Sequence, residues 1–166
     1  MESALDRAGL SSATRMTFHI AQINIGTAVG PVDGPLLADF HALLDPVNAL
    51  ADAAPGFVWR LQTEAGNATA LRPYDDDRII VNMSVWESIK ALRAFVYGGM
   101  HVGVMRRRRE WFERFPSSYL ALWWVPAGVV PTVEDAKLRL RSLDAHGPTP
   151  YAFTFRQTFA PEPVPA

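Results

Sequence analysis

SVWESIKALRAFVYGGMHVGVMRRRREWFERF, residues 84–115, is the stretch around which the chain is organised. Its hydrophobic periodicity predicts two helical segments that meet at the glycine pair 98–99. At about 100° per residue, His101 and Arg108 fall on one face of the second segment. The other members of that face are apolar: Val104, Met105, Trp111, Phe112 and Phe115. A histidine and an arginine on an apolar helix face are the sharpest chemical signal in this sequence.

Four consecutive arginines, residues 106–109, do not form one basic patch, because a helix spreads its successive side chains around its axis. Only Arg108 is predicted to face inward. The outward charges are expected to form surface pairs at i,i+4 spacing, namely Arg106–Glu110, Arg109–Glu113 and Glu110–Arg114. An arginine in apolar surroundings must find an acceptor. Either an internal carboxylate, with Glu87 and Glu134 as candidates, or an anionic ligand would supply it.

Length and composition indicate one globular domain. The chain has 166 residues, of which 49% are hydrophobic and 20% charged, enough to bury a sizeable core. We expect a domain over residues 16–159, with a flexible arm at 1–15 and a flexible tail at 160–166. A net charge of -1 and the lack of a long apolar run argue against nucleic-acid and membrane partners. Without a secretory signal in the arm, a cytoplasmic location is expected.

Alternation and turn signals predict the order of the elements. The expected strands are residues 16–25, 57–63, 78–85, 119–126 and 151–159, and the expected helices are 36–53, the pair within 84–115, and one that ends at Leu143. Ser84 with Glu87, and Thr132 with Asp135, have capping-box spacing. Pro46 is expected to kink its helix.

This order is that of a ferredoxin-like β-α-β-β-α-β unit, an α+β fold whose antiparallel sheet carries helices on one face. The strands are apolar on both faces, so the second face also needs a cover. A second copy of the chain is the simplest one, which predicts a homodimer.

Several segments resemble a bacterial family called domain of unknown function 3291. They are HIAQINI, PGFVWRLQ, SVWESIKALRAFVY, RRREWF, LALWWVPAG and GPTPYAFTF, spread over residues 16–155. The resemblance implies a dimeric α+β barrel, in which two ferredoxin-like subunits pack sheet to sheet and each encloses a pocket between its sheet and helices. That superfamily includes cofactor-independent antibiotic-biosynthesis monooxygenases, haem-degrading monooxygenases, and isomerases or cyclases. Shared fold does not select among them.

The candidate catalytic residues are His101, Arg108 and Asn82. A neutral imidazole suits proton abstraction near pH 7, and His101 could instead ligate haem or simply donate to a backbone carbonyl in a packed wall. Arg108 would hold a carboxylate or enolate oxygen, and Asn82 would help to stabilise the anion. The candidate ligand-binding residues are Asn24, Trp59, Arg60, Tyr97, Met105, Trp111, Phe112 and Trp124. Each has a structural alternative, because aromatic side chains usually fill cores and strand amides usually bond to the backbone.

Several site types are excluded by the sequence. It lacks cysteine, so disulfides, thiolate metal sites and cysteine nucleophiles are ruled out. It lacks the serine-hydrolase elbow, the zinc-protease motif, the P-loop and the dinucleotide fingerprint. The acidic run 75–77 lacks the spacing of a calcium loop. No metal is expected.

The leading hypothesis is an enzyme that acts on a small hydrophobic substrate, aromatic or polyketide-like as in natural-product biosynthesis. His101 would abstract a proton without a cofactor, which fits a monooxygenase or an isomerase or cyclase. The alternatives are a non-catalytic ligand-binding protein and a haem-binding or haem-degrading protein.

Overall fold

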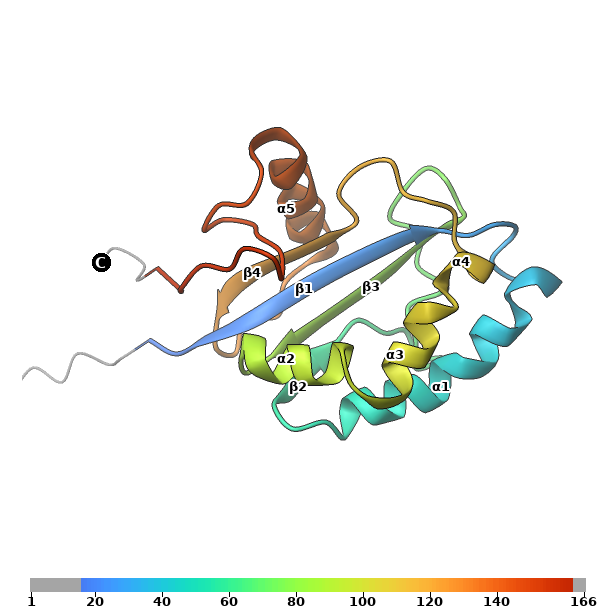
Figure 1. Cartoon of the computed structure of the whole chain (residues 1–166), viewed down its shortest axis with the longest axis horizontal. Coiled ribbons are helices and arrows are strands. Elements are labelled where there is room, and N and C mark those ends of the chain that lie inside the picture. The colour runs from blue at the N-terminus through green and yellow to red at the C-terminus, as the bar shows by residue number, and fades with distance from the viewer. Residues whose placement is uncertain (1–15, 163–166) are drawn as a thin grey trace, which may run out of the picture.

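A four-stranded antiparallel sheet is the centre of the computed structural model, which describes residues 16–162 (Figure 1). Its strands are β1 (Phe18–Thr27), β2 (Phe57–Arg60), β3 (Ile79–Trp86) and β4 (Leu120–Pro126). Their spatial order is β2-β3-β1-β4, as in a ferredoxin-like unit. The predicted α+β, ferredoxin-like fold is confirmed. The predicted arm at 1–15 and the last four residues of the predicted tail lie outside the described part.

Strand register decides which side chains share a face of the sheet. On β1 and β3, Gln22 lies opposite Ser84 and Asn24 lies opposite Asn82. Because side chains alternate along a strand, these four polar residues lie on one face. The intervening residues of the same strands, such as Ile23, lie on the other.

Four of the helices cover the face that carries the polar residues (Figure 1). They are α1 (Ala38–Asp52), α2 (Ile89–Val96), α3 (Gly99–Arg106) and α4 (Arg108–Trp111), and a 3-10 turn, η1 (Pro35–Leu37), leads into α1. This agrees with the expected helical layer. The predicted helix pair within residues 84–115 is present, but its second member is broken into α3 and α4.

The last helix, α5 (Val133–His146), lies on the opposite face, which differs from the expectation of helices on one face alone. Its buried residues Ala136, Leu140 and Leu143 join a core with Ile23 and Trp123. Leu61 and Tyr74 also pack against that core. The face that was expected to need a second subunit is thus covered within the chain, and the homodimer stays a prediction, which light scattering at micromolar concentration would test.

Residues 151–159 do not form the predicted strand. They make only isolated bridges, Thr149–Ala152, Thr154–Gln157 and Leu122–Phe153. Two of these bridges close tight turns, so the chain folds back on itself instead of extending along β4. Phe153 alone pairs with β4: its N–H donates to the carbonyl oxygen of Leu122 at 2.9 Å, and its carbonyl oxygen accepts from the N–H of Leu122 at 2.8 Å.

Helix starts were predicted with mixed success. The capping box of Thr132 and Asp135 is confirmed at the start of α5. The box predicted at Ser84 is wrong, because Ser84 belongs to β3. The cap of α2 is Ser88, whose side chain accepts a bond from the N–H of Ala91 at 3.1 Å. Pro46 lies inside α1, which runs on through it as one helix.

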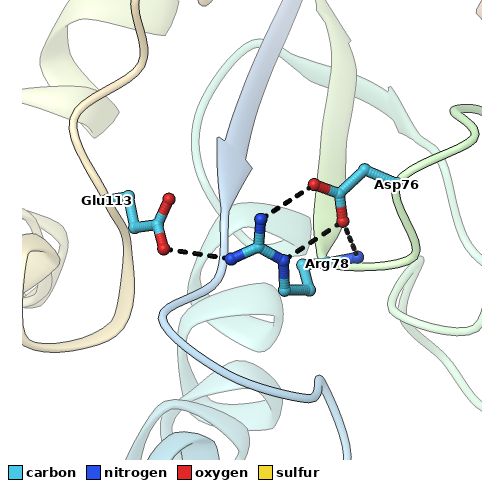
Figure 2. Close-up of polar contacts among 3 residues, drawn as sticks. All are labelled: Asp76, Arg78 and Glu113. Carbon is cyan, nitrogen blue, oxygen red and sulfur yellow. Dashed lines mark hydrogen bonds and ion pairs between the residues drawn. The ribbon is translucent and has the colours of Figure 1, made fainter.

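The surface ion pairs differ from the predicted i,i+4 pairs. Glu110 pairs with Arg107 at 2.8 Å, and Glu113 pairs with Arg78 at 3.0 Å. The predicted pairs need one continuous helix, but the helix is interrupted between α3 and α4 and ends at Trp111, before Glu113 and Arg114. Figure 2 shows Arg78 between Glu113 and Asp76, the latter at 3.0 Å. This exposed cluster links the segment after α4 to the start of β3, and it occupies a carboxylate of the acidic run 75–77.

We predict that Gly56→Ala destabilises the fold more than Gly66→Ala. Both glycines have left-handed φ, +80° and +82°, so both variants incur a backbone cost of about 1–2 kcal/mol. Only at Gly56 would the new methyl lie 2.6 Å from Cβ of Ala91, whereas nothing lies within 4 Å at Gly66. The overpacking adds roughly 1–3 kcal/mol, measurable as the difference in free energy of unfolding by denaturant titration. Equal losses in the two variants would contradict the close approach of the turn before β2 to α2.

Candidate functional site

A polar floor, made of Gln22, Asn24, Asn82 and Ser84, lies on the helix-facing side of β1 and β3. Nε2 of Gln22 donates to Oδ1 of Asn82 at 2.7 Å and to Oγ of Ser84 at 2.9 Å. Nε1 of Trp86 donates to the same Oγ at 2.9 Å. Gln22 and Ser84 are only 6% and 7% exposed, so this network satisfies groups that would otherwise be costly to bury.

A main cavity of about 380 Å³ lies between this floor and helices α1 to α3, within the size range of small-molecule sites. A side pocket of about 120 Å³ extends from it toward α4. His101, Met105 and Arg108 line both spaces. The helical layer leaves this room because it packs loosely: α1 buries only Ala51, and none of the residues of α3 is buried.

His101, on α3, is held by one backbone contact. Its Nδ1 lies 2.9 Å from the carbonyl oxygen of Val96. A carbonyl oxygen can only accept, so Nδ1 carries the proton and Nε2 of the neutral ring is left as an acceptor. Burial lowers the pKa of His101, and the bond to Val96 opposes this only in part. The imidazole is therefore neutral at pH 7, the form that a general base requires.

The contact with Val96 is also the one that a purely structural histidine makes. What distinguishes His101 is its position on the wall of both the main cavity and the side pocket. Its ring is 5.0 Å from that of Phe95, measured between centroids, which holds the imidazole against an apolar neighbour.

Arg108, at the start of α4, reaches back to β1. Nη2 donates to the carbonyl oxygen of Ile25 at 2.9 Å, and Nη1 lies 3.5 Å from Oδ1 of Asn24. Its guanidinium lies 5.2 Å from the ring centroids of both Phe112 and Tyr119. Burial lowers the pKa of Arg108 while Tyr119 raises it, but a guanidinium stays charged.

No carboxylate within residues 16–162 forms an ion pair with Arg108, so the predicted internal partners Glu87 and Glu134 are not used. Two bonds leave several of the guanidinium N–H donors unused. A half-buried cation with spare donors beside a cavity is suited to an anionic oxygen.

Gly26 permits the close approach of α4 to β1. A Cβ at this position would lie 2.8 Å from Cδ1 of Phe112 and 3.1 Å from Nη2 of Arg108. A larger residue would displace both side chains from the side pocket. Gly26, near the end of β1, itself lines the side pocket.

Most of the predicted site residues come together. The main cavity is lined by His101, Arg108, Asn82, Asn24, Arg60, Tyr97 and Met105, and the side pocket by Trp111 and Phe112 as well. Arg60 is engaged elsewhere, since it bonds Asp52 at 2.7 Å and the carbonyl of Gly66 at 2.6 Å. Tyr97 is 64% exposed and lies at the rim.

Trp59 and Trp124 line neither space, which corrects their prediction as ligand-binding residues. The register of β2 shifts between Phe57 and Trp59, so Phe57 faces the cavity while Trp59 packs against the opposite core. Trp124 packs beside Phe159, to whose carbonyl oxygen its Nε1 donates at 2.7 Å.

Sequence reasoning missed Gln22, Ser84, Trp86 and Asn48. The sequence did carry a signal for Ser84. Residues at i and i+2 of a strand lie on one face, so Asn82 and Ser84 form a polar pair on β3, as Gln22 and Asn24 do on β1. Asn48, on α1, lines the cavity, while the apolar Leu50 of the same helix is 46% exposed.

Within residues 16–162 no three His, Asp or Glu side chains are grouped closely enough to hold a metal ion. No helix in that part of the chain combines the length and the apolar character that crossing a membrane requires.

The sequence profile of the family described as "Domain of unknown function (DUF3291)" matches residues 19–165. The chain belongs to this family. No curated protein matches it.

Among solved structures, SnoaB, a cofactor-independent oxygenase from Streptomyces nogalater, is similar with 19% identity and a TM-score of 0.43, covering 69% of this chain and 96% of SnoaB. Rv0793 from Mycobacterium tuberculosis has 16% identity and a TM-score of 0.46, covering 69% and 98%. The haem-degrading protein Rv3592 from the same organism has 16% identity and a TM-score of 0.39, covering 70% and 98%. These likenesses are too distant to carry an argument about activity.

We predict that His101 titrates below pH 6.5 and carries its proton on Nδ1 when neutral. An unfolded histidine binds a proton near pH 6.5, and folded His101 does so only at lower pH. Between these two values the unfolded state binds more protons, so the free energy of unfolding falls as the pH falls. Nitrogen-15 NMR would report the tautomer and the pKa. Denaturant titrations at a series of pH values should show that the free energy of unfolding declines less with falling pH in His101→Gln than in the parent chain. Equal pH dependence in the two proteins would contradict the prediction.

Proposed function

We propose that the chain is an enzyme that removes a proton from a carbon atom adjacent to a carbonyl group in a small hydrophobic molecule. The observation that carries this proposal is the position of His101, whose Nε2 is left as an acceptor, on the wall of a cavity that Arg108 and the polar floor also line. A base, a cation and amide donors beside one apolar space are the groups that proton abstraction next to a carbonyl needs.

Each group has a role in the proposed reaction. The carbonyl oxygen lies over the polar floor, and His101 accepts the proton from the neighbouring carbon. Negative charge then develops on that oxygen, where Arg108 and Asn82 stabilise it. The side pocket, lined by Phe40, Trp111 and Phe112, takes the apolar part of the molecule, which favours aromatic or polyketide-like substrates.

The resulting anion has two outcomes. If it reacts with molecular oxygen, the protein is a cofactor-independent monooxygenase. If it is reprotonated or closes a ring, the protein is an isomerase or a cyclase. Incorporation of label from ¹⁸O₂ into the product would identify the first, and a product of unchanged mass would identify the second.

A haem group fits these residues poorly. His101 could supply an axial ligand, but the same cavity is lined by the polar floor, whose hydrogen-bonding groups an apolar macrocycle would not satisfy. Leaving several polar groups without partners costs about 1–3 kcal/mol each. Addition of haemin should therefore give no Soret band that depends on His101.

We predict that the chain accelerates exchange of the acidic C–H hydrogens of 2-tetralone in D₂O, followed by proton NMR. Replacing His101 by Gln should slow this exchange by about 10²–10⁴-fold, the usual contribution of a general base. His146→Gln is the matched control, because His146 is exposed at the end of α5. Full exchange by a folded His101→Gln variant would overturn the mechanism. Tight binding of 2-tetralone without any exchange would favour a non-catalytic binding protein.

A further inference from the structure

We propose that Ser84 and Gln22 give the polar floor a fixed hydrogen-bond polarity, so that the cavity selects ketones and their enolates over ligands that present N–H donors. This inference rests on the proposed function in one respect, since it assigns the same cavity to the substrate. It concerns residues to which the proposed reaction gives no role, and it names what the floor recognises.

The polarity begins at Ser84. The indole Nε1 of Trp86 can only donate, and so can the amide Nε2 of Gln22. Both end on Oγ of Ser84, each at 2.9 Å, and together they occupy its two lone pairs. The hydroxyl hydrogen of Ser84 cannot point at either donor and has no acceptor among residues 16–162. Ser84 lines the main cavity, so this hydrogen is available to a ligand.

Gln22 transmits the same polarity to Asn82. The two hydrogens of its Nε2 are used by Oγ of Ser84 and by Oδ1 of Asn82, at 2.9 and 2.7 Å. With Oδ1 engaged, Asn82 is left with its Nδ2 hydrogens, and Asn82 also lines the cavity. The bond from Trp86 thus leaves the Ser84 hydroxyl as a donor toward the cavity. The bond from Gln22 leaves the side-chain amide of Asn82 as a second donor.

Arg108 extends the donor array toward the side pocket. It approaches Oδ1 of Asn24 with Nη1 at 3.5 Å, which leaves the Nδ2 hydrogens of Asn24 available, and the guanidinium keeps unused donors of its own. Oε1 of Gln22 is the one amide oxygen of the floor that receives no donor from residues 16–162. Donors therefore outnumber acceptors along the floor, while Nε2 of His101 is an acceptor on the helical wall of the cavity.

A donor-rich surface with one cation binds oxygen acceptors, and most strongly those that carry negative charge. A ketone provides an acceptor oxygen, and its enolate provides a charged one. An aromatic amine whose N–H groups point at the floor would place them against the donors of Ser84 and Asn82 and leave both unpaired, which is costly at Ser84, only 7% exposed. The chemical class selected is therefore the ketone and its enolate.

Three naphthalene probes, of which the ketone and the hydrocarbon match in size, test this inference by equilibrium binding. They are 2-acetonaphthone, its hydrocarbon isostere 2-isopropenylnaphthalene, and 2-naphthylamine. Ser84→Ala should weaken the binding of 2-acetonaphthone by about two- to tenfold, the loss expected for one neutral hydrogen bond. The affinity for the hydrocarbon should change by no more than about twofold, because the hydrocarbon makes no such bond. Ser84→Thr keeps a hydroxyl group and should retain ketone affinity. An equal loss of affinity for ketone and hydrocarbon would assign Ser84 a packing role only. Tighter binding of the amine than of the ketone would mean that the floor presents acceptors instead of donors. Either result overturns the proposal.

A second measurement needs no change at Ser84. Polarisation of the Ser84 hydroxyl by a ketone should alter the bond that Oγ accepts from Trp86. The indole N–H resonance of Trp86, assigned with Trp86→Phe, should therefore shift on addition of 2-acetonaphthone. The indole of Trp124 is the internal control, since it bonds the carbonyl of Phe159 outside the cavity. A ketone that binds without moving the Trp86 resonance contradicts the proposal.

Both measurements are also made in the His101→Gln background, where the proposed base is absent. Ketone selectivity that persists there, together with unaccelerated C–H exchange in the parent chain, would refute the proposed catalysis and support the polarity of the floor. Normal C–H exchange without ketone selectivity would refute the polarity alone.

Discussion

Polar side chains at the centre of an otherwise apolar sheet determine how this chain is arranged. The pairing of β1 with β3 aligns Gln22 with Ser84 and Asn24 with Asn82 on the face that the helices cover. Apolar helix side chains pressed onto these groups would leave hydrogen-bonding capacity unsatisfied, at about 1–3 kcal/mol for each group. The helical layer instead buries little at the middle of the sheet, and the main cavity occupies that space.

The opposite face of the same strands shows what happens when this constraint is absent. Ile23, Met83 and Trp123 are almost completely buried there, in one core with the buried residues of α5. A shift of one residue in the register of β1 would exchange the two faces and put the polar residues into this dense core. The fold therefore assigns most of its close packing to one side of the sheet and its binding capacity to the other.

His101 and Arg108 satisfy a structural and a chemical requirement together. Each is anchored by a single backbone carbonyl, that of Val96 for the histidine and that of Ile25 for the arginine. One carbonyl is enough to orient each side chain, yet it leaves Nε2 of the imidazole and several guanidinium donors for a ligand. The break between α3 and α4 is compatible with this, because two short helices can present both side chains to the same space.

The sequence by itself determined the period of each element. Alternation in HIAQINI and the 3.6-residue period around His101 were enough to predict the ferredoxin-like order and the inward direction of His101 and Arg108. Only the tertiary structure decided which face of the sheet each side chain lies on and which side of the molecule each helix covers. Phe57 and Trp59 should share a face by alternation, but the irregular pairing of β2 with β3 separates them, and Ser84 matched a helix cap in spacing although its partners are Gln22 and Trp86. Local periodicity records which side chains avoid water, whereas the face, the register and the hydrogen-bond partner depend on strands that are distant in the chain and meet only in the folded protein.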